Sequence, residues 1–131
     1  MIKRIIVVCM LLCTLSVNIS FAAVSSIQAD DHFNLMIAHL YSNGLLTIQL
    51  ETYVQYPLAG VSSCTLQKII NNVWTDVESI PKPYPYESND GSFSGTVDCS
   101  SHITPDETYR VKVQIYTNNY SRYIYSSQQT F

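Results

Sequence analysis

The stretch TYRVKVQIYT, residues 108–117, alternates apolar and polar side chains over its whole length. Every second residue from Tyr109 to Ile115 is apolar or aromatic, and Arg110 and Lys112 stand between them. A period of two is typical of a β-strand with one face in a core and the other toward solvent. The stretch therefore predicts a half-buried strand whose apolar residues point inward.

The rest of the chain repeats this pattern in short segments. No segment longer than one turn shows a helical period, and clusters of turn-forming residues separate the alternating segments. Six further strands are predicted, at residues 33–41, 46–51, 62–70, 73–80, 91–99 and 122–130. Seven short strands joined mostly by hairpins predict an all-β fold, a seven-stranded antiparallel β-sandwich.

Polar residues and prolines mark the connections between these strands. Residues 42–44 read Ser-Asn-Gly, and Asn-Asn pairs stand at 71–72 and 118–119. Asparagine and glycine tolerate the positive φ angles that tight hairpin turns need. Three alternating prolines within residues 81–85 lack a backbone N–H, so an extended loop is predicted there.

The first 22 residues have the pattern of a secretory signal peptide. Lys3 and Arg4 precede an apolar run at residues 5–12, and Ser20-Phe21-Ala22 places small residues at positions −3 and −1. The run is shorter than the roughly 20 apolar residues that a bilayer span requires. We expect cleavage near Ala23, a polar lead at 23–32, one domain at 33–131 and a secreted, extracellular protein.

The charge balance disfavours polyanionic partners. The chain has 7 basic and 10 acidic residues, and the leader holds two of the basic ones, which leaves 5 − 10 = −5 after cleavage. An acidic surface lacks the basic patch that nucleic acid or anionic lipid requires. We therefore expect neither a nucleic-acid partner nor membrane association of the mature protein.

Two cysteines remain after the leader is removed. Cys9 and Cys13 lie in the leader, where a lipid-modified cysteine is the competing interpretation, whereas Cys64 and Cys99 lie in the domain. An exported domain with two cysteines favours a disulfide, which would close a loop of 99 − 64 = 35 residues and stabilise the fold by about 3.8 kcal/mol. A redox or metal-binding pair is the alternative, although CxxC spacing is absent. In a sandwich the bond would join the third strand to the end of the fifth, across the core.

The segment ITPDETY, residues 103–109, resembles the corner of fibronectin type III domains. An aliphatic residue is followed by Pro105 two positions later and by Tyr109 six positions later, at the start of a strand. The resemblance implies a tyrosine corner, in which the Tyr109 hydroxyl bonds back to the backbone. It also implies an immunoglobulin-like sandwich, with residues 66–77 as the middle strand pair. Leader, single domain and residues 74–77 are also similar to small secreted Gram-positive bacterial proteins of unassigned function.

Few residues could carry catalysis. His32, His39 and His102 are the histidines, and no GxSxG nucleophile motif accompanies them. His102 adjoins two serines, which leaves a small hydrolase as a minor alternative. Asp30-Asp31-His32 could hold a divalent ion weakly, but a polar lead is the simpler interpretation. We expect no enzyme activity, no cofactor and no metal site.

Tyrosine is the unusual component of this protein, with 10 residues. Apart from Tyr109, two clusters form a candidate binding surface: Tyr84, Tyr86, Tyr116, Tyr120, Tyr123 and Tyr125. Tyrosine has a rigid apolar body and a polar tip, which suits binding, although ordinary sheet packing would also explain it. The sequence predicts a non-catalytic module that binds an unknown protein at a cell surface. A glycan-binding module is the alternative.

Overall fold

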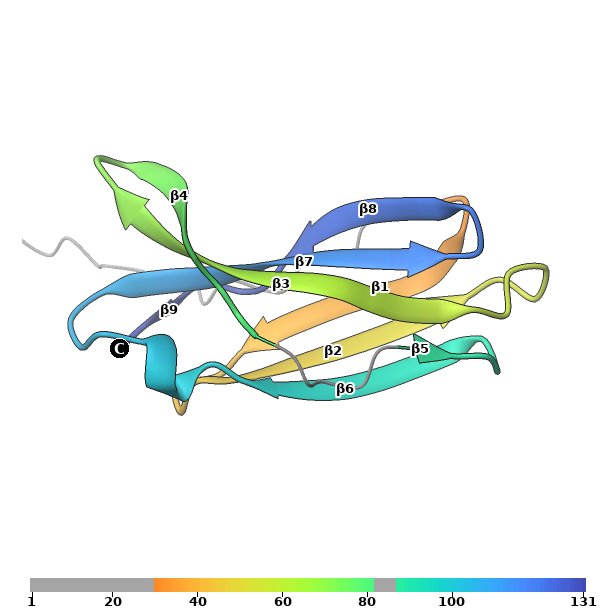
Figure 1. Ribbon diagram of the computed structural model, residues 1–131, viewed down its shortest axis with the longest axis horizontal. Coiled ribbons are helices and arrows are strands. Elements are labelled where there is room, and N and C mark those ends of the chain that lie inside the picture. The colour runs from red at the N-terminus through yellow and green to blue at the C-terminus, as the bar shows by residue number, and fades with distance from the viewer. Residues whose placement is uncertain (1–29, 82–86) are drawn as a thin grey trace, which may run out of the picture.

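The protein is an all-β sandwich of two antiparallel sheets (Figure 1). The computed structural model describes residues 30–81 and 87–131. The smaller sheet has three strands in the order β1-β2-β6: β1 Phe33–Leu40, β2 Leu45–Thr52 and β6 Ser92–Asp98. The larger sheet has the order β4-β3-β7-β8: β4 Val73–Ser79, β3 Ala59–Ile70, β7 Thr108–Thr117 and β8 Tyr120–Tyr125. Two short strands complete it, β5 Glu87–Ser88 beside β3 and β9 Gln129–Thr130 beside β7.

The strand predicted from the 108–117 alternation is confirmed as β7, with the same bounds. Its four inward residues, Tyr109, Val111, Val113 and Ile115, are each at most 3% exposed. They meet apolar residues of the smaller sheet such as Leu46, which is fully buried in the same core. Burial of a side chain of this size stabilises the fold by about 1.5–3 kcal/mol. The alternation of β7 therefore places one row of residues in the core and the next row on the outer face of the sheet.

The prediction of seven strands was wrong, because residues 30–81 and 87–131 already form nine. β5 and β9 are two residues long, too short for alternation to show. The predicted final strand at 122–130 is interrupted between β8 and β9. There the Ser126 N–H donates to Val111 O of β7, and the Ser127 N–H donates to Ala38 O of β1. The backbone thus crosses from one sheet toward the other, which an unbroken strand could not do.

The predicted disulfide is not present: Cys64 and Cys99 are both free thiols. Cys64 lies in β3 and Cys99 follows β6, so the two do come from different sheets, and both are fully buried. Burial is the main cause that raises the pKa of Cys64 to about 12, and the neighbouring Cys99 adds a smaller electrostatic effect. Burial is also the main cause that raises the pKa of Cys99 to about 11, with a smaller electrostatic effect from Asp98. Since thiolate is the reactive form, the raised pKa values lower the reactivity of both thiols, and no cross-link joins the two sheets at these cysteines.

Positive φ angles occur in all three predicted hairpin turns, including Asn118 with a φ of 29°. Asn71 and Asn72 have φ angles of 52° and 64° and form the two-residue turn between β3 and β4. Gly44, between β1 and β2, has a φ of 82°, and a Cβ there would lie 2.7 Å from Ser100 Cα. Glycine is therefore required at this position for both conformation and space.

The corner before β7 contains the bond that the tyrosine pattern implies. The Tyr109 hydroxyl accepts a hydrogen bond of 3.1 Å from the Thr104 N–H. Asp106 takes the left-handed conformation here, with a φ of 64°, and its N–H donates to Phe131 O at 2.8 Å. The Phe131 ring packs edge-on against Tyr109, with ring centroids 6.0 Å apart. The corner thus also holds the last residue of the sequence.

Candidate binding surface

Two of the predicted tyrosines lie side by side on the outer face of the larger sheet. Tyr123 and Tyr125 of β8 are 49% and 44% exposed. They are paired in register with Gln114 and Lys112, outward residues of β7. Tyr84 and Tyr86 lie outside the described residues.

Arg110 connects the exposed tyrosines to the one tryptophan of the sequence. Its Cζ lies 4.1 Å from the centroid of the Tyr125 ring and 4.5 Å from that of Trp74. Lys112 Nζ lies 5.3 Å from the centroid of the Tyr123 ring. A cation over an aromatic face is attracted by its quadrupole, by about 0.5–1 kcal/mol at exposed sites. The aromatic rings of β4 and β8 are therefore held by cations that β7 supplies between them.

Hydrogen bonds to residues of β3 and β4 hold Arg110 and Lys112 in position. Gln67 of β3 is 6% exposed and accepts a bond of 2.7 Å from Arg110 Nε, while its own Nε2 donates to Asp76 Oδ1 at 2.7 Å. Lys112 Nζ donates to Asp76 Oδ2 at 2.6 Å. The hydrogen bond from Lys112 is the largest cause that lowers the pKa of Asp76, and the bond from Gln67 adds to it. The hydrogen bond to Asp76 in turn raises the pKa of Lys112. Together these residues form what we call the aromatic–cation face: Gln67, Trp74, Asp76, Arg110, Lys112, Tyr123 and Tyr125.

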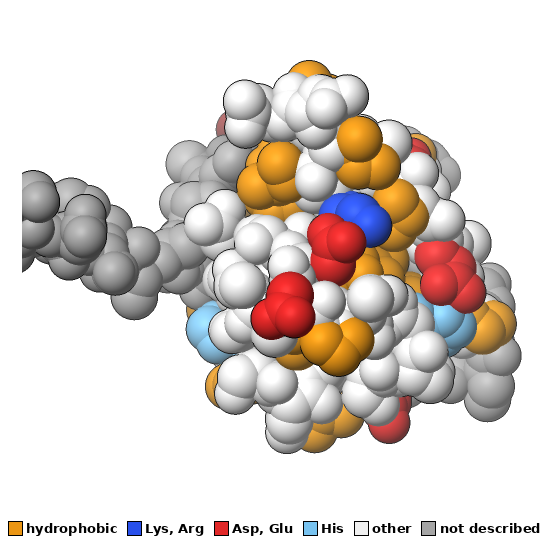
Figure 2. All heavy atoms as spheres, turned by 90° about the vertical axis from the view of Figure 1, so that its left-hand side faces the viewer, with side chains coloured by type: hydrophobic (Ala, Val, Ile, Leu, Met, Phe, Trp, Pro, Cys, Tyr) orange, Lys and Arg blue, Asp and Glu red, His pale blue; other side chains and the backbone are white. Residues whose placement is uncertain are grey.

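One apolar side chain of the β3–β4 hairpin continues this face. Ile69 is paired in register with Trp74, on the same side of the sheet, and is 38% exposed. Figure 2 views the end of the molecule at which this hairpin lies, and hydrophobic side chains lie there among cationic and acidic groups. The combined surface is mixed in character, with apolar, aromatic and charged side chains interleaved.

The other two described tyrosines of the predicted surface are occupied by internal contacts. The Tyr116 hydroxyl donates to Glu87 Oε2 at 2.7 Å. Burial, then the Glu87 carboxylate, raises the pKa of Tyr116 to about 12. The Tyr120 hydroxyl donates to Asp30 Oδ2 at 2.8 Å. The structure thus divides the predicted tyrosines into an exposed pair and two that join separate parts of the fold.

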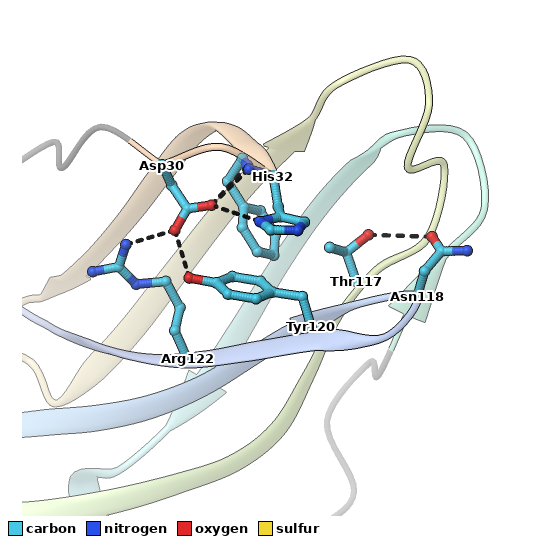
Figure 3. Close-up of polar contacts among 7 residues, drawn as sticks. Asp30, His32, Thr117, Asn118, Tyr120 and Arg122 are labelled. Carbon is cyan, nitrogen blue, oxygen red and sulfur yellow. Dashed lines mark hydrogen bonds and ion pairs between the residues drawn. The ribbon is translucent and has the colours of Figure 1, made fainter.

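Asp30 is the centre of a second polar cluster, at the start of β1 (Figure 3). Its side chain is 4% exposed, and its Oδ2 also accepts a bond of 2.7 Å from Arg122 Nη1. Burial by itself raises the pKa of Asp30. The hydrogen bonds from the His32 N–H, Arg122, Tyr120 and the Phe33 N–H outweigh this effect and lower the pKa to about 2. Asp30 therefore stays ionised and ties the start of β1 to β8.

His32 completes this cluster by stacking. Its ring centroid lies 3.9 Å from that of Tyr120, and the two rings are nearly parallel, at 7° (Figure 3). The centroid of the Tyr56 ring lies 4.9 Å away. Within residues 30–81 and 87–131, no three potential metal ligands lie close enough together to hold an ion. In this cluster the Asp30 carboxylate forms an ion pair with Arg122. The arrangement is thus an anchor for the segment that leads into β1.

The other two histidines contact different partners. His102 Nδ1 lies 2.7 Å from Glu78 Oε1, which joins the 3₁₀ turn Ser100–His102 to β4. His39 Nδ1 lies 3.3 Å from the Ser127 hydroxyl, and that serine is buried. A serine enclosed in this way offers no access to a substrate.

A shallow hollow lies on the outer face of the smaller sheet. It has a volume of ≈ 160 Å³, and its polar lining residues are Gln49, Glu51, Ser92 and Ser94. None of the predicted site residues borders it.

In the described part of the protein, no helix is long and apolar enough to cross a membrane.

The contacts between cations and aromatic rings in the aromatic–cation face were not predicted from the sequence. The alternation in β7 predicted correctly that Arg110 and Lys112 point outward, but it did not connect them to the tyrosines. A useful signal was present: two cations spaced by two residues on one strand, next to a Tyr-x-Tyr strand in the same hairpin.

Comparisons with protein-family models, with curated proteins and with solved structures each found no match.

Proposed function

We propose that this protein is an exported, non-catalytic interaction module of the fibronectin type III kind, which binds a protein partner through the aromatic–cation face. The two antiparallel sheets and the Tyr109–Thr104 bond support the fold type. The leader pattern of residues 1–22 supports export, although it lies outside the described residues.

One observation carries the binding proposal. Tyr123 and Tyr125 are close to half exposed, yet each ring is in contact with a cation held by its own hydrogen bond. Rings fixed before binding lose little conformational freedom when a partner docks. Tyrosine and tryptophan are also the residues that most often dominate binding energy at protein interfaces. The face therefore has the composition and the rigidity of a protein-binding surface.

The cation contacts favour a protein over a glycan. A sugar ring would bind by lying flat on an exposed aromatic face. Here Arg110 lies over both Trp74 and Tyr125. Edges and hydroxyl tips of the rings remain for contact, which suits the side chains of a protein.

A capture experiment with matched variants tests this proposal. The immobilised protein is incubated with surface extracts of the producing cell, and bound proteins are compared for wild type, a Tyr123→Ser/Tyr125→Ser variant and a Tyr53→Ser control. Tyr53 is 40% exposed and lies in the β2–β3 connection, away from the aromatic–cation face. We expect one partner whose affinity falls about 30-fold or more in the double variant and is unchanged in the control.

Two results would contradict the proposal. Equal capture by wild type and the double variant would remove the face from binding. Saturable binding on a glycan array, lost in the same double variant, would replace the protein partner with a sugar.

A further inference from the structure

Arg110 differs from the other described cations in how its charge is compensated. Lys68, Lys112 and Arg122 form ion pairs with carboxylates at 3.2, 2.6 and 2.7 Å. Within residues 30–81 and 87–131, no carboxylate forms an ion pair with Arg110, whose Nε donates to the neutral Gln67. The charge of Arg110 is thus not balanced by a carboxylate of the described residues.

Asp76 does not supply that group, although Gln67 connects it to Arg110. Its Oδ1 accepts a bond from Gln67, and its Oδ2 accepts one from Lys112. Both oxygens are therefore engaged, and its ion-pair partner is Lys112.

The guanidinium of Arg110 is also held in a fixed orientation. Trp74 comes from β4 and Tyr125 from β8, on opposite sides of β7 in the sheet, and both rings contact its flat group. Gln67 holds Nε at 2.7 Å. What remains for a ligand is the edge that carries Nη1 and Nη2, which have no hydrogen-bond acceptor among the described residues. Every buried polar side-chain atom of the described residues has a hydrogen-bond partner. Because Nη1 and Nη2 have none, both nitrogens are accessible to solvent.

We infer that the Nη1/Nη2 edge of Arg110 is a binding site for a carboxylate of the protein partner, supplied by an aspartate, a glutamate or the partner's C-terminal residue. This inference rests on the proposed function and adds the chemistry of the contact. Two parallel N–H groups match the two oxygens of a carboxylate, and such a charge-assisted pair is stronger than a neutral hydrogen bond. A guanidinium already fixed by stacking loses little side-chain entropy when the pair forms.

The overall charge of the protein favours one carboxylate over a polyanion. The sequence has 10 acidic and 7 basic residues, a formal net charge of −3 at pH 7, and the leader holds two of the basic ones. A nucleic acid or sulfated polysaccharide would be repelled by this acidic surface. A single carboxylate at Arg110 meets one local positive charge.

The first test follows the arginine side chain directly. The ¹⁵N-labelled full-length protein is titrated with the peptide acetyl-Gly-Glu-Gly-amide while the Nε–Hε NMR signals are recorded. The Arg110 signal is identified by its loss in Arg110→Lys. We expect this signal to shift saturably, with a dissociation constant of the order of 1 mM, while the Arg122 signal stays in place. The matched peptide acetyl-Gly-Gln-Gly-amide should produce no shift.

Other ligands and variants complete the test. No shift with the glutamate peptide, or equal saturation with glucuronate or inorganic phosphate, would overturn the assignment to a protein carboxylate. Arg110→Lys keeps the charge but loses the planar fork, and should weaken partner capture about tenfold, whereas Lys68→Gln should not. Because Arg110→Lys could unfold, Gln67→Glu serves as a second variant. It would supply an internal carboxylate to Arg110 and should abolish the shift.

The two proposals can fail separately. If partner capture depends on Tyr123 and Tyr125 but neither the glutamate peptide nor Arg110→Lys has an effect, the binding face stands and the carboxylate site is wrong. If the peptide shifts Arg110 but the tyrosine variant captures its partner normally, the carboxylate site stands and the proposed function is wrong.

Discussion

Replacing Asp30 with asparagine removes one charge from the contact between the start of β1 and β8 while keeping the size of the side chain. The carboxylate is 4% exposed and accepts hydrogen bonds of 2.7 Å from Arg122 and 2.8 Å from Tyr120 (Figure 3). These bonds and those from two backbone N–H groups lower its pKa from 3.8 to about 2. A difference of that size corresponds to about 2 kcal/mol of stability at neutral pH. Asp30→Asn should lose about that amount.

The sign of the pH dependence follows from the direction of the pKa change. Because the folded pKa of Asp30 lies below its ordinary value of 3.8, the contribution is fully present above that value. It is lost as the pH falls through about 2, where the folded carboxylate becomes protonated. The stability difference between wild type and Asp30→Asn should therefore be constant from pH 7 to about pH 5 and shrink toward pH 2.

Urea unfolding followed by circular dichroism, at steps from about pH 7 down to about pH 2, measures this difference. Asp31→Asn is the matched control, because Asp31 is the adjacent acidic residue and is exposed. Its effect should stay within about 0.5 kcal/mol. The reasoning would be refuted if Asp30→Asn matched that control at pH 7. A deficit that stayed unchanged down to about pH 2 would equally rule out ionisation as its cause.

Three further substitutions or treatments test the fold. Gly44→Ala should destabilise the protein by more than about 1 kcal/mol in thermal unfolding, since φ is 82° and the new Cβ would overlap a neighbouring backbone; an unchanged midpoint would contradict this. Tyr109→Phe should cost about 1 kcal/mol in urea unfolding through the lost corner bond, and no loss would show that the bond is dispensable. Peptide-level mass spectrometry should find Cys64 and Cys99 unalkylated in the native protein at pH 8 and alkylated in urea, because burial raises the pKa of both thiols; rapid native labelling, or a disulfide-linked peptide pair, would refute this.

Much of the fold was predictable because strand formation is recorded locally. The alternation of residues 108–117 specified β7 to the residue, and the Asn-Asn pair at 71–72 specified the turn between β3 and β4. The interruption after β8 was not predictable in this way. Ser126 and Ser127 are polar, yet they are buried by hydrogen bonds to both sheets, and those partners lie far away in the sequence.

The cysteines of the core and the tyrosines of the predicted surface show the same division between local and long-range information. Composition and compartment favoured a disulfide, whereas the fold places Cys64 and Cys99 as free thiols in a closed core. The tyrosine clusters were visible in the sequence, but Tyr120 packs at the Asp30 anchor while Tyr123 faces solvent.

The sequence by itself determined the class of fold, the outward position of Arg110 and the corner at Tyr109, because side-chain alternation and turn preference act between near neighbours. The tertiary structure alone decided that Arg110 lies between Trp74 and Tyr125. That contact depends on the order and register of strands β4, β3, β7 and β8. Residues distant in the sequence become neighbours only when the sheet has assembled, and the aromatic–cation face exists only from that point.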